Sequence, residues 1–365
     1  MLCSTKNKIK RRLEIESTNK KRFITFIAVA YGAVALMCIF MYIGLKAGKD
    51  LSVFAATQMY FPACGVMLGF LLFGDKNTKI PKAGFIVALI SALVMMALSI
   101  VSVFAPQDDA WSVSKFFVYG QYVTMVGSVI CYVLFWISGK EKRKNVGLDR
   151  PAIKMSIFMV ALFIVLFVAK AFIVSILYQL FNSHIEYGVI AIAKLVFTPE
   201  NGYSAVVMLF YIFTFLLMYW GEEYGWRYYL QPILQNKFGL RRGVLILGVA
   251  WGIWHLGLDF MFYTSVEAGP IYLILQIITC ISLGIFFGYA YMKTRNIWAL
   301  SLMHLINDNY LVLLAGGDSS ILQNQTITLA HIPANLISSL ILVAFIFAPI
   351  YNGKKEEQKF EQEAA

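Results

Sequence analysis

Residues 204–234, SAVVMLFYIFTFLLMYWGEEYGWRYYLQPIL, combine a long apolar run with two adjacent acids and an arginine. The run is long enough for a membrane-spanning helix, which needs about 20 mostly apolar residues. An ionisable side chain near the bilayer centre costs roughly 2.5–3.5 kcal/mol on insertion scales, so it seldom lies there without a partner or a function. The stretch therefore predicts a membrane helix whose Glu222, Glu223 and Arg227 belong to a buried polar site.

The composition of the whole chain is that of a membrane protein. Of its 365 residues, 59% are hydrophobic and 14% are charged, and the mean hydropathy is +0.70. A soluble domain has about 25% charged residues. The net charge of +11 falls mainly in short segments between apolar runs, which indicates control of membrane topology rather than nucleic-acid binding. The five cysteines show no CxxC spacing, so the sequence supports neither a disulfide framework nor a zinc knuckle.

Ten segments are long and apolar enough to span a membrane as helices. Lysine and arginine concentrate in alternate connections, and short loops rich in these residues stay in the cytoplasm. We therefore predict an all-α, polytopic membrane protein with about ten transmembrane helices and both termini in the cytoplasm. The predicted spans are approximately 23–45, 51–73, 83–105, 116–137, 154–181, 204–234, 242–263, 270–292, 297–315 and 327–350.

These spans suggest four parts of the chain. Residues 1–22 form a basic cytoplasmic tail, and 23–181 form an N-terminal bundle of five transmembrane helices. Residues 204–350 form a C-terminal transmembrane bundle, and 351–365 form a second cytoplasmic tail. The basic tail is expected to lie against anionic lipid. Nearly all the unusual polar residues lie in the C-terminal bundle, so we expect the function to reside there.

Two further apolar segments carry ionisable groups: one ends in Trp-Gly-Ile-Trp-His (251–255), and the other contains His-Leu-Ile-Asn-Asp (304–308). An α-helix rises 1.5 Å per residue. If one helix covers 204–234, then Glu222, His255 and His304 all lie near the middle of their helices. Polar groups at a common depth can satisfy one another's hydrogen bonds. We therefore predict that three helices contribute to one intramembrane site.

The spacing within two of these helices predicts side-chain pairs. Glu223 and Arg227 are four residues apart on one helix face, which suits a salt bridge. His304 and Asp308 have the same spacing, so both can point to one place. Glu222 is then free to accept a proton from water.

Other polar and aromatic residues are expected to have structural roles. Trp251 and Trp254 are interpreted as core or lipid-facing aromatics, and His184 and His331 as structural histidines. Lys170, within the fifth predicted span, is expected to extend its ammonium to the interface or to neutralise a neighbouring charge.

The ordered runs Glu-Glu-x-x-x-Arg, aromatic-x-x-x-His and His-x-x-x-Asp resemble the motifs of the CPBP family. This family comprises the CAAX-processing prenyl-protein endopeptidases and the bacterial bacteriocin-processing and immunity (Abi) proteins. The resemblance covers approximately residues 204–315. It implies that 204–350 is the catalytic bundle of an intramembrane glutamic-type endopeptidase. The wider contexts of the first two motifs resemble bacterial members, which implies a multi-pass protein of a bacterial cytoplasmic membrane.

The resemblance also implies roles for the matched residues. Glu222 would act as general base on water with help from His255, and His304 with Asp308 would stabilise the oxyanion of the tetrahedral intermediate. The supporting residues would be Glu223, Arg227 and Asn307.

Two positions depart from the family pattern. Asp308 stands where eukaryotic members favour asparagine, and a carboxylate donates a hydrogen bond only when it is protonated. Asp308 would instead orient His304, or it would leave donation to the oxyanion to Asn307 or Asn309. At the other position, Trp251 replaces the commoner phenylalanine.

The expected substrate is a peptide or protein at the lipid bilayer, such as a prenylated CAAX protein, a bacteriocin precursor or a signalling peptide. No cofactor and no nucleic acid are expected. One alternative is a zinc metalloprotease in which Glu222, His255 and His304 hold the metal with an open fourth position. A second is a non-catalytic immunity or scaffold protein that binds a toxic peptide or a membrane protein. A third is a transporter or proton relay.

Overall fold

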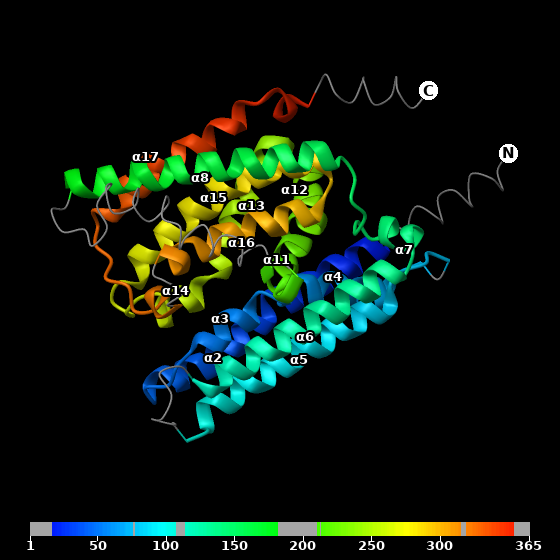
Figure 1. Cartoon of the computed structure of the whole chain (residues 1–365), viewed down its shortest axis with the longest axis horizontal. Coiled ribbons are helices and arrows are strands. Elements are labelled where there is room, and N and C mark those ends of the chain that lie inside the picture. The colour runs from blue at the N-terminus through cyan, green and yellow to red at the C-terminus, as the bar shows by residue number, and fades with distance from the viewer. Residues whose placement is uncertain are drawn as a thin grey trace.

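The computed structural model describes residues 17–75, 77–106, 114–181, 210–211, 213–314 and 319–353. Regular structure in these ranges is helical, with no strand, which confirms the all-α prediction (Figure 1). The first helical stretch covers Ser17–Lys46 and ends in α2 (Gly32–Lys46). The further helices up to residue 181 are α3 (Ser52–Gln58), α4 (Phe61–Phe73), α5 (Lys82–Phe104), α6 (Lys115–Ile137), α7 (Lys140–Asn145) and α8 (Ile153–Phe181).

The second half of the chain is also helical where it is described. Within the catalytic region predicted at 204–350, α11 (Leu216–Glu223) continues through the π-helical turn η1 (Tyr224–Leu230) into α12 (Gln231–Phe238). The remaining α-helices are α13 (Leu240–Trp254), α14 (Leu256–Met261), α15 (Gly269–Thr294), α16 (Ile297–Leu314) and α17 (His331–Val343). Short 3₁₀ turns cover Ser319–Leu322, Ala344–Phe347 and Pro349–Asn352.

Seven of the described helices are long and apolar enough to cross a membrane, as in an integral multi-pass protein. They coincide with the first five predicted spans and with those at 242–263 and 270–292. The spans at 204–234, 297–315 and 327–350 are not among the seven, and the last of these is a shorter apolar helix, His331–Phe347. The count of ten and the cytoplasmic termini therefore stay predictions.

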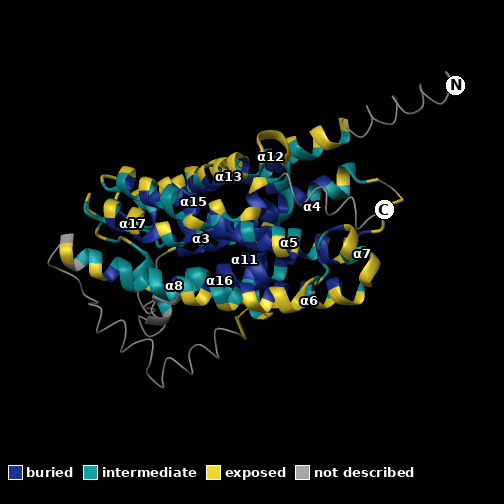
Figure 2. Cartoon of the chain, turned by 90° about the horizontal axis from the view of Figure 1, so that it is seen from above, coloured by how far each residue is buried: buried dark blue, intermediate teal, exposed yellow. Residues whose placement is uncertain are grey.

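Large hydrophobic side chains are exposed on the outer faces of the bundle, as expected of a surface that contacts lipid. Ile137 is 69% exposed and Leu93 is 64% exposed. Figure 2 shows the opposite pattern inside, where α11 is almost entirely buried between the other helices. The polar residues of α11 are therefore enclosed by protein.

The long helix α8 packs with the C-terminal helices. It lies along α15, α16 and α17, on the side away from α2–α6 (Figure 1). The side-chain amide of Asn296, just before α16, donates to the Ser156 hydroxyl over 3.0 Å, and the Phe163 and Phe286 rings lie 5.6 Å apart. The sequence analysis assigned this helix to the N-terminal bundle, but its contacts make it a wall of the C-terminal one.

Helix α11 connects the two groups of helices, because it contacts α4 and α6 on one side and α16 on the other. Two glycines permit this close approach. A Cβ atom on Gly221 would collide with the Met59 carbonyl, and one on Gly225 would collide with Pro62. The break between α3 and α4 thus receives the α11–η1 segment that follows it 160 residues later in the chain.

Candidate active site

Three segments bring the predicted polar residues together. Glu222 and Glu223 are the last two residues of α11, immediately before the π-helical turn that holds Arg227. His255 joins α13 to α14, and His304 lies on α16. π-Helical turns occur frequently at functional sites because they re-aim side chains within a helix.

The Trp251 indole lies at the centre of the cluster. Its Nε1–H donates to Glu222 Oε2 over 2.7 Å. Its ring lies 5.6 Å from the His304 ring and 6.0 Å from the His255 ring. The acid and both imidazoles therefore surround one side chain, which places them in a single site.

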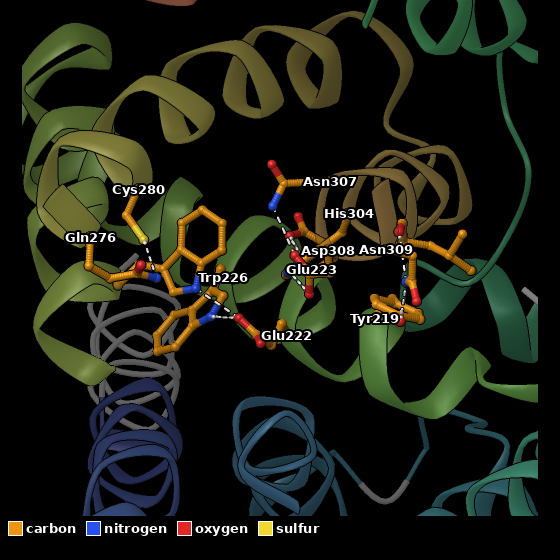
Figure 3. A network of polar contacts seen from close by, with 12 residues as sticks. Tyr219, Glu222, Glu223, Trp226, Gln276, Cys280, His304, Asn307, Asp308 and Asn309 are labelled. Carbon is orange, nitrogen blue, oxygen red and sulfur yellow. Dashed lines mark hydrogen bonds and ion pairs between the residues drawn. The ribbon is translucent and has the colours of Figure 1, made fainter. Parts of the chain in front are cut away.

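Glu222 accepts a second hydrogen bond from Trp226. The Trp226 Nε1–H donates to the same carboxylate oxygen, Oε2, over 3.3 Å, and Glu222 is only 2% exposed (Figure 3). Hydrogen bonds to an ionised group are shorter and stronger than neutral ones. The interpretation of Trp251 as only a packing aromatic was therefore incomplete, because its N–H fixes the Glu222 carboxylate.

The predicted Glu223–Arg227 pair is present and fully buried. Arg227 Nε lies 3.2 Å from Glu223 Oε2. The guanidinium also lies over the rings of Trp251, at 4.5 Å from the centroid, and of Phe287, at 5.4 Å. Its Nη1 and Nη2 have no hydrogen-bond acceptor among the described residues, so the two aromatic faces supply the compensating attraction.

Glu223 also binds His304, a contact that the sequence analysis did not predict. Glu223 Oε1 lies 2.8 Å from His304 Nδ1, and Asp308 Oδ2 lies 3.3 Å from His304 Nε2 (Figure 3). An imidazolium donates from both ring nitrogens, and an ionised carboxylate only accepts, so this arrangement suits a protonated ring. His304 therefore lies between two acids, with one carboxylate oxygen facing each of its ring nitrogens.

The two asparagines next to Asp308 differ in their free hydrogen-bond donors. Asn309 donates to the Tyr219 hydroxyl over 2.5 Å and to the Leu305 carbonyl over 2.9 Å, which occupies both of its amide hydrogens. Asn307 donates to Asp308 Oδ1 over 2.8 Å. A primary amide has two N–H bonds, so Asn307 retains one donor.

His255 has one engaged and one available ring nitrogen. Its Nδ1 lies 3.0 Å from the Trp251 carbonyl oxygen, which can only accept. The proton of the neutral ring is therefore on Nδ1, and Nε2 has a free lone pair.

A cavity of about 670 Å³ connects these groups. Glu222, His255, His304, Asn307 and Asp308 line it, whereas Glu223 and Arg227 lie outside its lining. A water molecule or a peptide in the cavity would meet the first group directly. Glu223 and Arg227 lie behind the cavity wall, where Glu223 contacts His304.

The remaining predicted residues have varied positions. Lys170 and His331 also line the cavity, and the His331 ring packs against Tyr178 with centroids 4.8 Å apart. His184 lies outside the described residues. Trp226 escaped the sequence analysis, although its position four residues after Glu222 on one helix was a usable signal.

The predicted zinc ligands fit a metal poorly. Both ring nitrogens of His304 face carboxylate oxygens, at 2.8 Å and 3.3 Å, and do not point to a place shared with Glu222 and His255 as metal ligands would. Within the described part of the chain, no group of three or more His, Cys, Asp or Glu side chains is arranged to hold one.

Comparison with known proteins assigns the segment that contains the site. Residues 204–310 match the family model described as type II CAAX prenyl endopeptidase Rce1-like. Neither a curated protein nor a solved structure matches the chain. The segment that contributes Glu222, His255, His304 and Asp308 thus matches the model of a CAAX-protease family, in agreement with the resemblance of its motifs.

Proposed function

We propose that this protein is an intramembrane endopeptidase that hydrolyses peptide bonds with water activated by Glu222. The observation that carries the proposal is the position of the Glu222 carboxylate. Two indole N–H groups hold its Oε2 at the wall of a cavity shared with His255 and the His304–Asp308 pair. The match of residues 204–310 to a CAAX endopeptidase family supports the same activity.

In the proposed reaction, the second Glu222 oxygen, Oε1, takes a proton from a water molecule in the cavity. The resulting hydroxide attacks the carbonyl carbon of the substrate peptide bond and forms a tetrahedral intermediate. His255 Nε2 orients the water through its free lone pair. Glu222 then gives its proton to the departing amine nitrogen, which breaks the C–N bond and regenerates the carboxylate.

The developing oxyanion needs preorganised donors and positive charge. The His304 ring nitrogens face other acids, because Nδ1 bonds Glu223 and Nε2 lies 3.3 Å from Asp308 Oδ2. We infer that the second N–H of Asn307 donates to the oxyanion and that the His304 imidazolium contributes its charge. Asp308 then orients both residues, which explains how a carboxylate serves at this position.

The proposed substrates are peptides or proteins held at the lipid bilayer, with CAAX-like processing and bacteriocin or signalling-peptide maturation as the candidate processes. The proposed topology has ten spans with both termini in the cytoplasm of a bacterium. Such an arrangement brings a membrane-anchored peptide to a site enclosed by helices.

The mechanism is proposed to need no metal, because each ring nitrogen of His304 faces a carboxylate. Dialysis of the purified protein against a chelator should leave the rate of peptide cleavage unchanged. Loss of activity that zinc restores would overturn the metal-free mechanism and favour the metalloprotease.

The direct test is cleavage of a fluorogenic prenylated peptide by the purified protein in liposomes. General-base catalysis contributes about 10²–10⁴ in rate, so Glu222→Gln should lower kcat by that factor without unfolding the protein. Glu267→Gln on an exposed loop is the matched control and should keep full activity. Equal turnover by Glu222→Gln, Glu267→Gln and wild type would reject the base and favour the non-catalytic immunity or scaffold role.

A further inference from the structure

The cavity of the candidate site extends toward only one end of the helix bundle. Figure 1 shows α7 and α12 at one end, called the α7 end below, and α14 near the opposite end. The lining residues of α6, Phe117 and Gln121, lie near the start of that helix, and those of α8 begin at its midpoint, Phe167. The fully described helices α4, α7 and α12 contribute no lining residue. The cavity therefore occupies the half of the bundle away from α7.

The candidate catalytic residues form the floor of this cavity. Glu222, Trp251 and His304 are the lining residues of α11, α13 and α16 that lie closest to the α7 end. Directly beyond the floor, the Arg227 guanidinium packs on the Phe287 ring at 5.4 Å from its centroid, and both side chains are fully buried. Packed protein therefore lies between the floor and the α7 end.

Aromatic side chains continue this packing as far as α7. The rings of Trp220, Tyr224 and Tyr228 stack one on the next, with centroids 4.7 Å and 4.8 Å apart. The Tyr224 hydroxyl donates to the carbonyl of Val146, directly after α7, over 2.9 Å. The Tyr228 ring lies so close to Gly147 that a Cβ atom there would collide with it. These contacts close the α7 end of the described structure.

The other end of the cavity lies at the surface of the molecule. The start of α3 and the segment before α17 meet there, because the Gln323 side-chain amide donates to the Ser52 hydroxyl over 2.7 Å. Ser52 and Gln325 line the cavity, whereas Asn324 and Thr326, on either side of Gln325, are exposed. The cavity therefore reaches the surface at this end, which we call the rim end.

The distribution of charge assigns the two ends to the two sides of the membrane. Helix α7, KEKRKN, is mostly basic, and α13 begins with Leu-Arg-Arg at the same end. At the rim end, residues 262–268 and 319–330 contain no lysine or arginine. Short segments rich in these residues stay in the cytoplasm. The closed α7 end is therefore expected in the cytoplasm and the rim end on the outer face.

We propose that the active site is entered from the outer face of the membrane, and that its substrates are peptide segments exposed on that face. Exported peptides and the outer ends of membrane proteins belong to this class. The proposal rests on the proposed hydrolase function and narrows its candidate processes. It favours maturation of exported peptides over processing of prenylated proteins in the cytoplasm.

Thiol labelling in sealed membrane vesicles tests the side of entry without requiring catalysis. Ala171 lines the cavity on α8, so a membrane-impermeant maleimide should label Ala171→Cys in right-side-out vesicles and not in inverted vesicles. Ala290→Cys is the matched control, because Ala290 is fully buried on α15 between the floor and the α7 end, and it should stay unlabelled in both preparations. Wild type, labelled in parallel, accounts for the native cysteines. Labelling of Ala171→Cys in inverted vesicles, or in neither preparation, would overturn the proposal.

Cleavage in the same vesicles tests the side on which the substrate is used. The probe is a fluorogenic prenylated peptide with a charged dye that cannot cross the bilayer. Right-side-out vesicles should cleave the added peptide, and inverted vesicles should not cleave it until detergent opens them. The reverse result would overturn the proposal. If neither preparation cleaves the peptide after detergent is added, the hydrolase function fails, and the labelling pattern still decides the side of entry.

The maleimide conjugate also tests whether the substrate passes through this cavity. Labelled Ala171→Cys should lose cleavage in right-side-out vesicles, because the added group occupies the space above the floor. Labelled Glu267→Cys should retain cleavage, because Glu267 is exposed and lies outside the cavity lining. Cleavage that survives complete labelling of Ala171→Cys would show that the substrate reaches Glu222 by another route, and the proposal would be wrong.

Discussion

The Trp251 side chain contacts more of the candidate site residues than any charged residue described above. It donates to Glu222, packs against both imidazoles and supplies the aromatic face beneath Arg227. A phenylalanine, the commoner residue in the family motif, would keep the ring contacts but lose the donor. The Trp251 indole therefore packs like a phenylalanine ring and also fixes the position of the Glu222 carboxylate.

Replacement of Trp251 by phenylalanine should isolate that hydrogen bond. A bond to a charged group contributes about 1.5–3 kcal/mol, so kcat/KM for the prenylated peptide should fall about 10- to 100-fold. Trp298→Phe is the matched control, because the Trp298 N–H donates to the Leu148 carbonyl outside the site over 3.0 Å. Its kcat/KM should stay close to that of wild type. Full activity of Trp251→Phe would show that Trp226 alone holds the carboxylate.

The buried Glu223–Arg227 pair should affect stability more than chemistry. Removal of one member of a buried pair costs about 3–5 kcal/mol, because the other charge stays buried. Arg227→Met should therefore lower the free energy of unfolding by about that amount, measured by denaturant titration in detergent micelles. The double variant Glu223→Gln/Arg227→Met should be more stable than Arg227→Met. Equal stability of the two variants would contradict the role of the pair.

At the residue scale, the sequence predicted the pairs within a helix and the meeting of three helices at one site, but not the individual hydrogen bonds between those helices. The spacing of four residues was sufficient for Glu223–Arg227 and His304–Asp308. The Glu223–His304 bond joins residues 81 positions apart, so only the packing of α11 against α16 creates it. Residue spacing also could not predict the surroundings of Lys170, because they depend on the helices that pack against α8.

Helices α13 and α15 illustrate how elements position the site. Gly248 and Gly252, four residues apart on α13, face Ile281 and Ile277 of α15 so closely that a Cβ atom would lie 2.6 Å and 2.8 Å from the respective Cα atoms. Small residues at such spacing allow membrane helices to approach closely. Gly252 lies directly after Trp251, so the helix contact also sets the position of the indole.

Substitution of Gly252 by alanine should push α13 away from α15. Overpacking of this kind costs about 1–3 kcal/mol, so both the melting temperature in micelles and kcat/KM should fall. Gly32→Ala is the control, because no atom lies within 4 Å of a Cβ placed there. A Gly252→Ala protein with the stability and activity of wild type would show that α15 yields to the added methyl group.

At the element scale, hydropathy located the helices well but not their irregularities. The predicted spans at 83–105 and 116–137 agree closely with α5 (Lys82–Phe104) and α6 (Lys115–Ile137). The predicted span at 51–73 is instead divided into α3 and α4, and the predicted helix over 204–234 contains the π-helical turn. These features arise where α11 packs into the α3–α4 break, and hydropathy does not report such packing.

The whole molecule has a predicted orientation that labelling can check. Positively charged loops stay in the cytoplasm, so residue 144 is expected inside and residue 267 outside. In intact cells, a membrane-impermeant maleimide should label Glu267→Cys and spare Lys144→Cys until the membrane is opened. Wild type, labelled in parallel, accounts for the native cysteines. Equal labelling of both variants from one side would contradict the ten-span topology.

Gly221 and Gly225 contact Met59 and Pro62, which lie outside the family-matched region 204–310. This region therefore depends on the N-terminal helices for part of its packing. Glu222 and Glu223 lie on a helix that packs against Met59 and Pro62, which are more than 150 positions upstream in the chain. A fragment that begins at residue 204 would lack this packing surface, and it would also lack helix α8, which packs against α15, α16 and α17. The N-terminal half therefore supplies part of the packing that holds the candidate site in place.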